Sequence, residues 1–246
     1  MEVFFAEPEH ISGNQITLDE FESRHIVHTL KKKKGDKIQV TDGRGNLYFS
    51  EIIDSAKQVK VEFQNKDNIE RKCPEVTLAV GFIRPNRLDT LIEKCTELGV
   101  RRFILFRSQF ANYVSFNKSR FNKILRQAIK QSLQYYLPEI EIIEKFDVFI
   151  DKSVTFDARI VAHDPNDPGM LTALNGSDLS THGSVMFAVG PEGGFSGDEI
   201  EKFKKSSFKI VSLGNTRLRT ETAAINGVSV LQSYLQYKKE TNIGNR

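Results

Sequence analysis

The hydrophobic and polar positions follow one rhythm over the first 70 residues and a different one afterwards. Before residue 70 the apolar runs are short and tend to alternate with polar positions, as half-buried strands do. In the last of these runs, Val59, Val61 and Phe63 alternate with Lys60 and Glu62. The strands predicted in this part span residues 3–5, 37–41, 47–53 and 58–63. We therefore expect a small strand-rich domain over residues 1–70.

This first domain also contains one predicted helix and one predicted tight turn. Thr17 and Glu20 have the spacing of a capping box, which predicts a short helix from this point to about Leu30. Residues 42–45, Asp-Gly-Arg-Gly, predict a hairpin turn. Four consecutive lysines, residues 31–34, follow the helix. Such a run is either a solvated loop or a contact for RNA phosphates.

Strand and helix patterns alternate after residues 65–72, a polar segment that we interpret as a linker. Strands are predicted at residues 76–82, 103–106, 140–143, 158–162, 185–189 and 208–213, with helices at 88–98 and 120–135 and two more that begin near Ser196 and Glu221. This alternation is typical of a parallel sheet covered by helices. The second domain is expected to span residues 74–240.

A glycine-rich turn joins the strand at residues 185–189 to the helix near Ser196. Its sequence, VGPEGGFS, contains Gly193 and Gly194, which allow positive φ and a close approach of the backbone to a ligand. Ser196 and Glu199 form the capping box that opens the helix. Open α/β sheets bind ligands at such turns, and the alternative is an ordinary tight connection.

The residues of this turn indicate what kind of ligand it accepts. It carries Glu192 and no basic residue, and neither G-x-x-x-x-G-K-[ST] nor G-x-G-x-x-G occurs in the chain. Phosphate-binding loops use such motifs at a helix N-terminus. The turn therefore favours a neutral or cationic ligand.

A second turn of the same kind follows the strand at residues 208–213. Gly214 ends this strand, residues 215–219 form a polar loop, and Thr220 is predicted to cap the helix that begins at Glu221. This helix has one apolar face, made of Ala224, Val228, Leu231 and Leu235. Two such turns near one sheet edge predict a pocket between them.

The two turns together make the sequence recognisable. GPEGGFSGDEI and SLGNTRLRTETA closely resemble the paired signature of the RsmE family, the SPOUT-class methyltransferases that modify uridine N3 in 16S ribosomal RNA. Residues 93–100, residues 127–132, and residues 25–30 with 35–36 are similar to three further family segments in the same order. Departures from the usual family residues occur at Lys31, Gln127, Gln134 and Arg217.

The resemblance implies a fold, an activity and a set of site residues. The fold would be an α/β SPOUT-type parallel sheet with a C-terminal trefoil knot, preceded by a small PUA-like β-barrel. The activity would be transfer of a methyl group from S-adenosylmethionine to N3 of a uridine in 16S ribosomal RNA of the small subunit. The resemblance places the cofactor against Val161, Ala162, Gly190, Glu192, Gly193, Gly194, Ser212, Leu213, Gly214 and Leu218. Arg219 is the candidate to stabilise negative charge on the uracil, and Glu221 is the candidate acid/base. Both side chains also suit the start of a helix, where Glu221 would favour the helix dipole.

Composition is that of a soluble globular protein, and the cysteine content predicts the cytoplasm. The chain has 246 residues, 39% hydrophobic and 27% charged. Its two cysteines, Cys73 and Cys95, exclude a disulfide framework, which indicates a reducing compartment. The first ten residues lack the pattern of a signal peptide, and the apolar runs are too short to span a membrane.

The net charge is only +3, but the charges are unevenly distributed. Residues 84–130 hold 11 Lys and Arg against 3 Asp and Glu, a net of +8. Such a concentration indicates a polyanion site or, alternatively, a solvated helix face. The residues predicted to contact RNA are Lys31, Lys32, Arg101, Arg102 and Arg107.

Several other functions are compatible with parts of the sequence. His25 and His28 have a spacing that could share a metal, but no second pair of ligands accompanies them, so no metal is expected. His163-Asp164 would suit a hydrolase, but a G-x-S-x-G elbow is missing. A non-catalytic RNA-binding factor on the same scaffold remains an alternative, and a nucleotide-using enzyme is disfavoured by the missing phosphate loop.

A homodimer is expected for two reasons. The last helix carries Leu231, Tyr234, Leu235 and Tyr237, more apolar surface than one small sheet face covers. The resemblance also implies dimerisation through the knotted domain.

Overall fold

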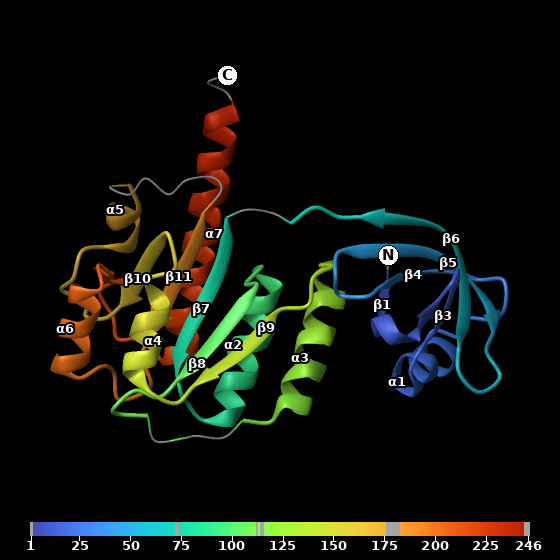
Figure 1. Ribbon diagram of the computed structural model, residues 1–246, viewed down its shortest axis with the longest axis horizontal. Coiled ribbons are helices and arrows are strands. Elements are labelled where there is room, and N and C mark those ends of the chain that lie inside the picture. The colour runs from blue at the N-terminus through green and yellow to red at the C-terminus, as the bar shows by residue number, and fades with distance from the viewer. Residues whose placement is uncertain (1, 72–73, 112, 114–115, 176–182, 244–246) are drawn as a thin grey trace. The chain divides into compact units, whose positions relative to one another are not determined.

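The computed structural model describes residues 2–71, 74–111, 113, 116–175 and 183–243. The chain divides into two compact units, coloured blue to teal and green to red in Figure 1 except where α3 returns to the first. The first unit comprises Met1–Arg71 together with Arg126–Leu137, and the second comprises Lys72–Leu125 and Pro138–Arg246. The hydrophobic pattern predicts the division near residue 70. It does not predict that residues 126–137 return to the first unit.

The first unit is built on a six-stranded sheet in the order β1-β4-β5-β6-β3-β2. Its strands are β1 (Val3–Phe5), β2 (Ile11–Ser12), β3 (Gln15–Thr17), β4 (Lys37–Thr41), β5 (Asn46–Asp54) and β6 (Lys60–Asn68). A 3₁₀ helix η1 (Pro8–His10), α1 (Glu20–Arg24) and a π-helix η2 (His25–Thr29) accompany them. Only β1 and β4 run parallel. The inward side chains form the core of this unit, with Phe4, Ile16, Val40, Ile52 and Val61 at most 2% exposed.

Two local predictions in this unit are wrong, and two short strands were not predicted. Thr17 does not cap a helix, because it ends β3, and the cap of α1 is Asp19, whose side chain accepts from the Glu22 N–H at 2.8 Å. The polar linker begins later than predicted, because β6 continues to Asn68 as the partner of Asn46. Strands β2 and β3 were missed because two or three residues are too few to show an alternating pattern.

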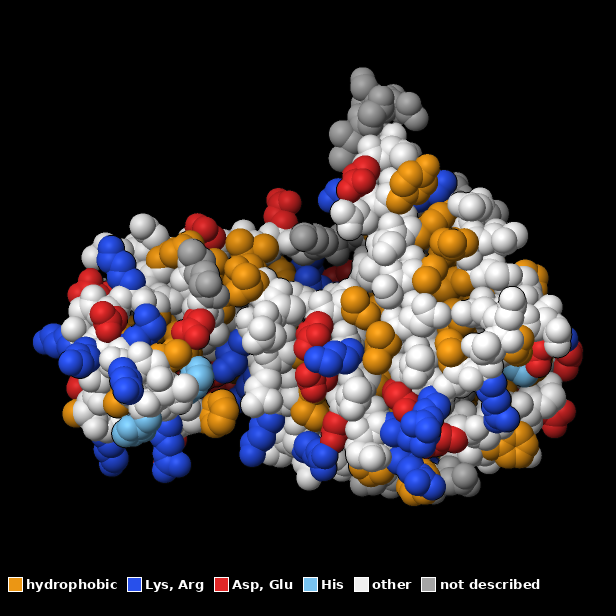
Figure 2. All heavy atoms as spheres, turned by 180° about the vertical axis from the view of Figure 1, so that it is seen from behind, with side chains coloured by type: hydrophobic (Ala, Val, Ile, Leu, Met, Phe, Trp, Pro, Cys, Tyr) orange, Lys and Arg blue, Asp and Glu red, His pale blue; other side chains and the backbone are white. Residues whose placement is uncertain are grey.

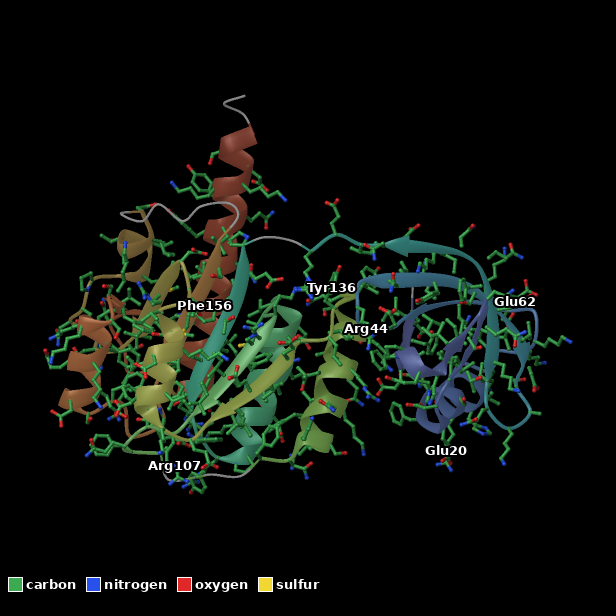
Figure 3. All side chains as sticks on the ribbon, in the orientation of Figure 1. Glu20, Arg44, Glu62, Arg107, Tyr136 and Phe156 are labelled. Carbon is green, nitrogen blue, oxygen red and sulfur yellow. The ribbon has the colours of Figure 1, made fainter. Side chains whose placement is uncertain are left out.

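The turn at residues 42–45 packs against the segment that returns after α3. The Gly45 N–H donates to the Tyr135 carbonyl at 2.7 Å, and the Leu137 N–H donates to the Gly43 carbonyl at 2.8 Å. Gly45 has φ +93°, and a Cβ there would lie 2.2 Å from the Tyr136 hydroxyl. Figure 3 labels Arg44 and Tyr136 side by side at this place. The close approach explains the glycine, and it attaches residues 135–137 to the first unit.

Charged pairs attach the preceding part of α3 to the same unit. Arg126 pairs with Glu7, and Lys130 pairs with Glu22. Glu22 is a buried residue, only 3% exposed. Burial raises the pKa of Glu22 above its ordinary value, although Lys130 acts in the opposite direction. Two of the basic residues counted in the +8 segment thus have structural partners.

The second unit contains an all-parallel sheet in the order β12-β10-β11-β7-β8-β9. Its elements are β7 (Glu75–Gly81), α2 (Pro85–Glu97), β8 (Arg102–Phe106), α3 (Lys118–Gln131), β9 (Glu139–Ile143), α4 (Phe146–Ser153), β10 (Ala158–Ala162), α5 (Met170–Asn175), β11 (Ser184–Val189), α6 (Gly197–Lys205), β12 (Lys209–Val211) and α7 (Thr220–Ile243). The predicted parallel α/β sheet is confirmed. The trefoil knot stays a prediction. The short helices α4 and α5 were not predicted.

Helices cover both faces of this sheet. Met186 and Ala188 of β11 pack in one cluster with Phe149 of α4 and Phe203 of α6. Phe187 lies between them in sequence and faces α7, where a Cβ on Gly227 would be 2.2 Å from its Cζ. Because successive side chains of a strand point to opposite faces, α7 and the pair α4 and α6 lie on opposite sides of the sheet, as Figure 1 shows.

Candidate functional site

A cavity of about 350 Å³ lies at the carboxyl ends of β10, β11 and β12. It is bordered by His163 after β10, by residues 190–192, 194 and 195 after β11, and by residues 212–214 and 216–220 after β12. All strands are parallel, so their carboxyl ends meet at one edge of the sheet, where open α/β folds bind ligands. The pocket predicted between the two turns is present.

The turn after β11 is held from both of its ends. The Gly194 N–H donates to the Pro191 carbonyl at 2.9 Å, and Gly194 has φ +75°, which a side chain would disfavour. Phe195 is 8% exposed and packs edge-on to Phe203 with ring centroids 4.8 Å apart. The aromatic cluster of the sheet therefore fixes the end of the turn.

The predicted capping box at the start of α6 is confirmed and has a second purpose. The Ser196 N–H donates to Glu199 Oε2 at 2.9 Å, while the Glu199 N–H donates to the Ser196 hydroxyl at 3.3 Å. Glu199 is 5% exposed and also accepts from the Ser108 hydroxyl at 3.1 Å and from the Gln109 N–H at 2.8 Å. One buried carboxylate thus joins the loop after β8 to the turn after β11.

The turn after β12 closes on itself. The Ser212 hydroxyl donates to the Gly214 carbonyl at 3.0 Å, and the Gly214 N–H donates back to that hydroxyl at 3.2 Å. Gly214 has φ +135°, a region that favours glycine. The helix that follows begins at Thr220, with the Ala223 N–H donating to the Arg219 carbonyl at 2.8 Å. Arg219, and not Thr220 as predicted, therefore occupies the cap position of α7.

The structure brings most of the predicted cofactor residues to this cavity. Those that border it are Ala162, Gly190, Glu192, Gly194, Ser212, Leu213, Gly214 and Leu218. Val161 is fully buried in the sheet core. Gly193 does not border the cavity either, because a Cβ on it would lie 2.6 Å from Cβ of Phe110. The glycine is thus explained by a close contact with the loop after β8, and its place against the cofactor stays a prediction.

The two predicted catalytic residues occupy different positions. Arg219 is exposed and borders the cavity. Glu221 lies in the first turn of α7, and its Oε1 is 3.8 Å from Nε of Arg87. Its side chain is 15% exposed, and Oε2 is buried without a hydrogen-bond partner among the described residues. Glu221 is therefore a nearly enclosed carboxylate, which does not itself border the cavity but contacts Arg87, a residue that does.

Arg87 of α2 was missed as a site residue. It borders the cavity, and its Nη1 lies 3.6 Å from Oε1 of Glu192, so the guanidinium lies between two carboxylates. The Glu192 carboxylate also accepts from the Arg84 N–H at 3.4 Å. In the sequence Arg87 is one of eleven basic residues in a charged segment, and a charge count does not distinguish it from the others.

The cavity is more basic than the sequence of the first turn suggests. Arg217 and Arg219 approach from the second turn and Arg87 from α2, against the single carboxylate of Glu192 on the wall. Arg217 Nη2 is 3.5 Å from the Glu192 carbonyl. The expectation of a neutral or cationic ligand needs revision, because the guanidinium groups also suit a carboxylate or a phosphate.

The three arginines predicted to contact RNA lie at opposite ends of β8. Arg101 precedes β8, Arg102 begins it and pairs with Glu139 at 3.4 Å, and Arg107 follows its other end. At about 3.3 Å per residue, Arg102 and Arg107 are roughly 16 Å apart. Arg107 is exposed and lies at the same sheet edge as the cavity, at the lower end of the sheet in Figure 3. On the face drawn in Figure 2, basic and acidic side chains of the larger unit are interspersed.

The lysine run and the histidines belong to the first unit. Lys31 is exposed with φ +56°, and the Lys32 N–H donates to the Ile26 carbonyl at 3.1 Å. His25 and His28 lie in the π-helix η2. Among the described residues no group of three or more His, Cys, Asp or Glu is arranged to hold a metal ion.

The cysteines are accounted for only in part. Cys95 is free and fully buried, and its burial raises the pKa of the thiol. Cys73 lies outside the described residues. In the part of the chain that the structure covers, no helix is long and apolar enough to cross a membrane.

The second unit has a parallel sheet covered by helices, with a cavity at the carboxyl ends of its strands, and the first unit is small and β-rich. These features define a class of two-part α/β proteins. The family profile described as an RNA methyltransferase domain matches residues 70–232, and one described as an RNA methyltransferase PUA domain matches residues 18–64. The chain therefore belongs to this family of RNA methyltransferases.

Individual relatives extend the comparison over nearly the whole chain. Ribosomal RNA small subunit methyltransferase E 2 of Borreliella burgdorferi is 27% identical over 92% of this chain and 94% of its own. Ribosomal RNA small subunit methyltransferase E of Bacillus subtilis is 27% identical over 85% and 86%. A crystal structure of a ribosomal RNA small subunit methyltransferase E from Neisseria gonorrhoeae, bound to S-adenosyl methionine, matches the fold with a TM-score of 0.83, covering 95% of this chain and 98% of that one at 24% identity.

Proposed function

We propose that this RNA methyltransferase transfers a methyl group from S-adenosylmethionine to N3 of a uridine in 16S ribosomal RNA of the small subunit. The observation that carries the proposal is the cavity at the carboxyl ends of β10, β11 and β12, enclosed by the two turns on which the family resemblance rests. The names of the relatives support a small-subunit ribosomal RNA as the substrate. The cofactor in the Neisseria gonorrhoeae structure supports the methyl donor.

The residues of the cavity fit this cofactor. Gly190, Gly194 and Gly214 border the cavity without side chains, so the flat ring of an adenine can approach the backbone there. The Glu192 carboxylate complements the positive charge of the sulfonium group, and the nearby guanidinium groups complement the cofactor's own carboxylate. When bound, S-adenosylmethionine supplies an electrophilic methyl group.

The protein groups around the cavity have separate roles in this proposal. Arg219 is exposed at the cavity wall, where its guanidinium would stabilise negative charge on the uracil carbonyl oxygens once N3 loses its proton. The Glu221 carboxylate, held by Arg87 beside the cavity, would accept that proton or orient the imide N–H. Arg87 is a positioning residue, because it holds Glu192 and Glu221 from one guanidinium.

The RNA contacts in this proposal are divided between the two units. Arg107 would contact phosphates near the reacting uridine, because it is exposed at the carboxyl edge of the sheet. Lys31 and Lys32 would contact RNA from the first unit. Arg101 and Arg102 are weaker candidates, since both lie at the opposite end of β8 and Arg102 pairs with Glu139.

A cytoplasmic homodimer completes the proposal. Of the four side chains first considered, Leu231, Tyr234 and Leu235 are buried within the chain itself, so they do not call for a partner. Tyr237 is 60% exposed, and with the family resemblance it remains the support for dimerisation. Sedimentation equilibrium distinguishes a dimer from a monomer of 28.0 kDa.

An equilibrium titration with S-adenosylmethionine tests the proposed cofactor. Calorimetry of the full chain should give one site per chain, and Glu192→Gln should weaken it, because this change removes a negative charge from the cavity wall. The matched control is Glu139→Gln, which lies at the other end of the sheet. If the wild-type protein shows no binding, methyl transfer is excluded and a non-catalytic RNA-binding role on the same scaffold takes its place.

A further inference from the structure

An aromatic side chain lies on the solvent-facing side of the sheet in the first unit. Phe49 is 38% exposed, whereas its neighbours along β5, Tyr48 and Ser50, are each 5% exposed and point to the other face. Strand β5 is an interior strand, with β4 on one side and β6 on the other. The alternation of β5 places this ring on the outer face of the sheet, where it can contact a ligand.

Polar side chains lie on both sides of this ring. Gln39 of β4 and Asn65 of β6 are its direct cross-strand partners. The neighbouring row, across the same three strands, consists of Lys37, Glu51 and Glu62. Phe49 and these five residues border one cavity of about 490 Å³, which is as large as typical ligand pockets. Glu62, labelled in Figure 3, accepts from the Asn14 side chain at 2.9 Å and is thereby held in place.

We propose that this cavity binds one unpaired nucleobase of the RNA substrate, with the base stacked on Phe49. The inference rests on the proposed function, which supplies RNA as the ligand. An exposed ring on an open sheet face is the arrangement with which proteins stack single-stranded bases. The amides of Gln39 and Asn65 present donors and acceptors beside the ring, and they suit the edge of a base.

The charges of the cavity favour a base over a bare phosphate. Lys32 and Lys37 border it together with three carboxylates, those of Glu2, Glu51 and Glu62, which leaves a net charge of −1. Carboxylates only accept hydrogen bonds, and the exocyclic amino group of cytosine is a donor that Glu and Asp accept from. Uracil lacks such an amino group. Its only Watson–Crick donor is the N3–H, so we expect the cavity to favour an amino-bearing base such as cytosine over the uracil that is methylated.

Fluorescence anisotropy with short single-stranded oligocytidine and oligouridine RNA of equal length tests the site. Phe49→Ala should raise the Kd for oligocytidine about tenfold, as expected for loss of one stacked base. Phe49→Tyr keeps the ring and should bind nearly as the wild type does. Phe21→Ala is the matched control, because Phe21 is a 61% exposed phenylalanine of the same unit outside the cavity. Oligocytidine should bind the wild type more tightly than oligouridine.

Several outcomes would overturn the inference. The wild type could fail to bind oligocytidine, or Phe49→Ala could bind it with an unchanged Kd. Phe21→Ala could also weaken binding as much as Phe49→Ala does. An equal effect of Phe49→Ala on a duplex of the same sequence would also overturn it, since paired bases cannot stack on the ring. Methyl transfer by the wild type is measured separately. If binding depends on Phe49 but no methyl group is transferred, the proposed function fails and this site stands. If a methyl group is transferred but binding does not depend on Phe49, the site is rejected and the proposed function stands.

Discussion

Nε of Arg87 lies 3.8 Å from Oε1 of Glu221, and this contact joins helix α2 to the first turn of α7 beside the cavity. The same guanidinium reaches Glu192 at 3.6 Å. All three side chains are less than one third exposed, so solvent screens the contacts less than it would on an open surface. One cation thus sets the positions of two carboxylates to which we assign different roles.

Replacing this cation should impair catalysis. Arg87→Ala should lower the methyl-transfer rate roughly ten- to a hundredfold, because small displacements of aligned groups are costly. Arg87→Lys keeps the charge but not the planar fork, and should recover only part of the rate. Single-turnover rates at saturating cofactor and RNA provide the measurement. Arg102→Gln is the control, because Arg102 lies at the amino end of β8, away from the cavity. A normal rate in Arg87→Ala would contradict the positioning role.

Arg219 and Glu221 should have different effects on the reaction. Arg219→Ala should lower the rate roughly a hundredfold or more, as loss of a donor to a developing oxyanion does, with little change in S-adenosylmethionine affinity. Glu221→Gln keeps the shape but cannot accept a proton. It should remove or shift the acidic limb of the rate's pH profile if the carboxylate acts as the base. An unchanged profile would assign Glu221 to the helix start, and an unchanged rate in Arg219→Ala would end this mechanism.

The contact between Gly193 and Phe110 predicts an unusual rescue. Gly193→Ala should lower the free energy of unfolding or displace the turn after β11, because its Cβ would lie 2.6 Å from Cβ of Phe110. Phe110→Ala retains the Cβ and should not relieve the clash, whereas Phe110→Gly should. Urea unfolding of the single and double variants measures this. Equal rescue by the alanine and glycine variants would show that the aromatic ring, and not the backbone approach, requires the glycine.

The arginines at the two ends of β8 should differ in RNA binding. Arg107→Gln should weaken RNA binding and reduce the slope of log Kd against log salt by about 1, as loss of one phosphate contact does. Arg102→Gln should leave the slope nearly unchanged, because this side chain pairs with Glu139. Filter binding over a range of salt concentrations tests both. Equal slopes for the two variants would contradict the prediction that RNA phosphates contact Arg107, at the carboxyl end of β8, and not Arg102.

The sequence predicted what local patterns determine. The boundaries of β1, β4 and β10 are the predicted ones, and the Ser196–Glu199 capping box is present, because alternation and capping are properties of neighbouring residues. The two turns were placed correctly at one edge because parallel strands share their carboxyl ends. The family resemblance supplied the chemistry of the cavity.

What the sequence could not predict depends on residues far apart in the chain. The contact of Gly193 with Phe110 could not be predicted, because Phe110 belongs to a different loop. Arg87 looked like one charge among many, because its partners lie more than one hundred residues away. The +8 segment looked like one basic surface. Folding separates Arg102 from Arg107 and pairs Arg126 and Lys130 with acidic residues of the first unit.

Analysis of the methylated product tests the central claim most directly. The purified chain is incubated with radiolabelled S-adenosylmethionine and with small ribosomal subunits or their free RNA from cells that lack the enzyme. The RNA is then digested to nucleosides, which are identified by mass spectrometry. The account predicts label in 3-methyluridine, and loss of that label with Arg219→Ala. Label in a different nucleoside would contradict the proposed base, and absence of label despite cofactor binding would contradict the enzymatic function assigned to the cavity.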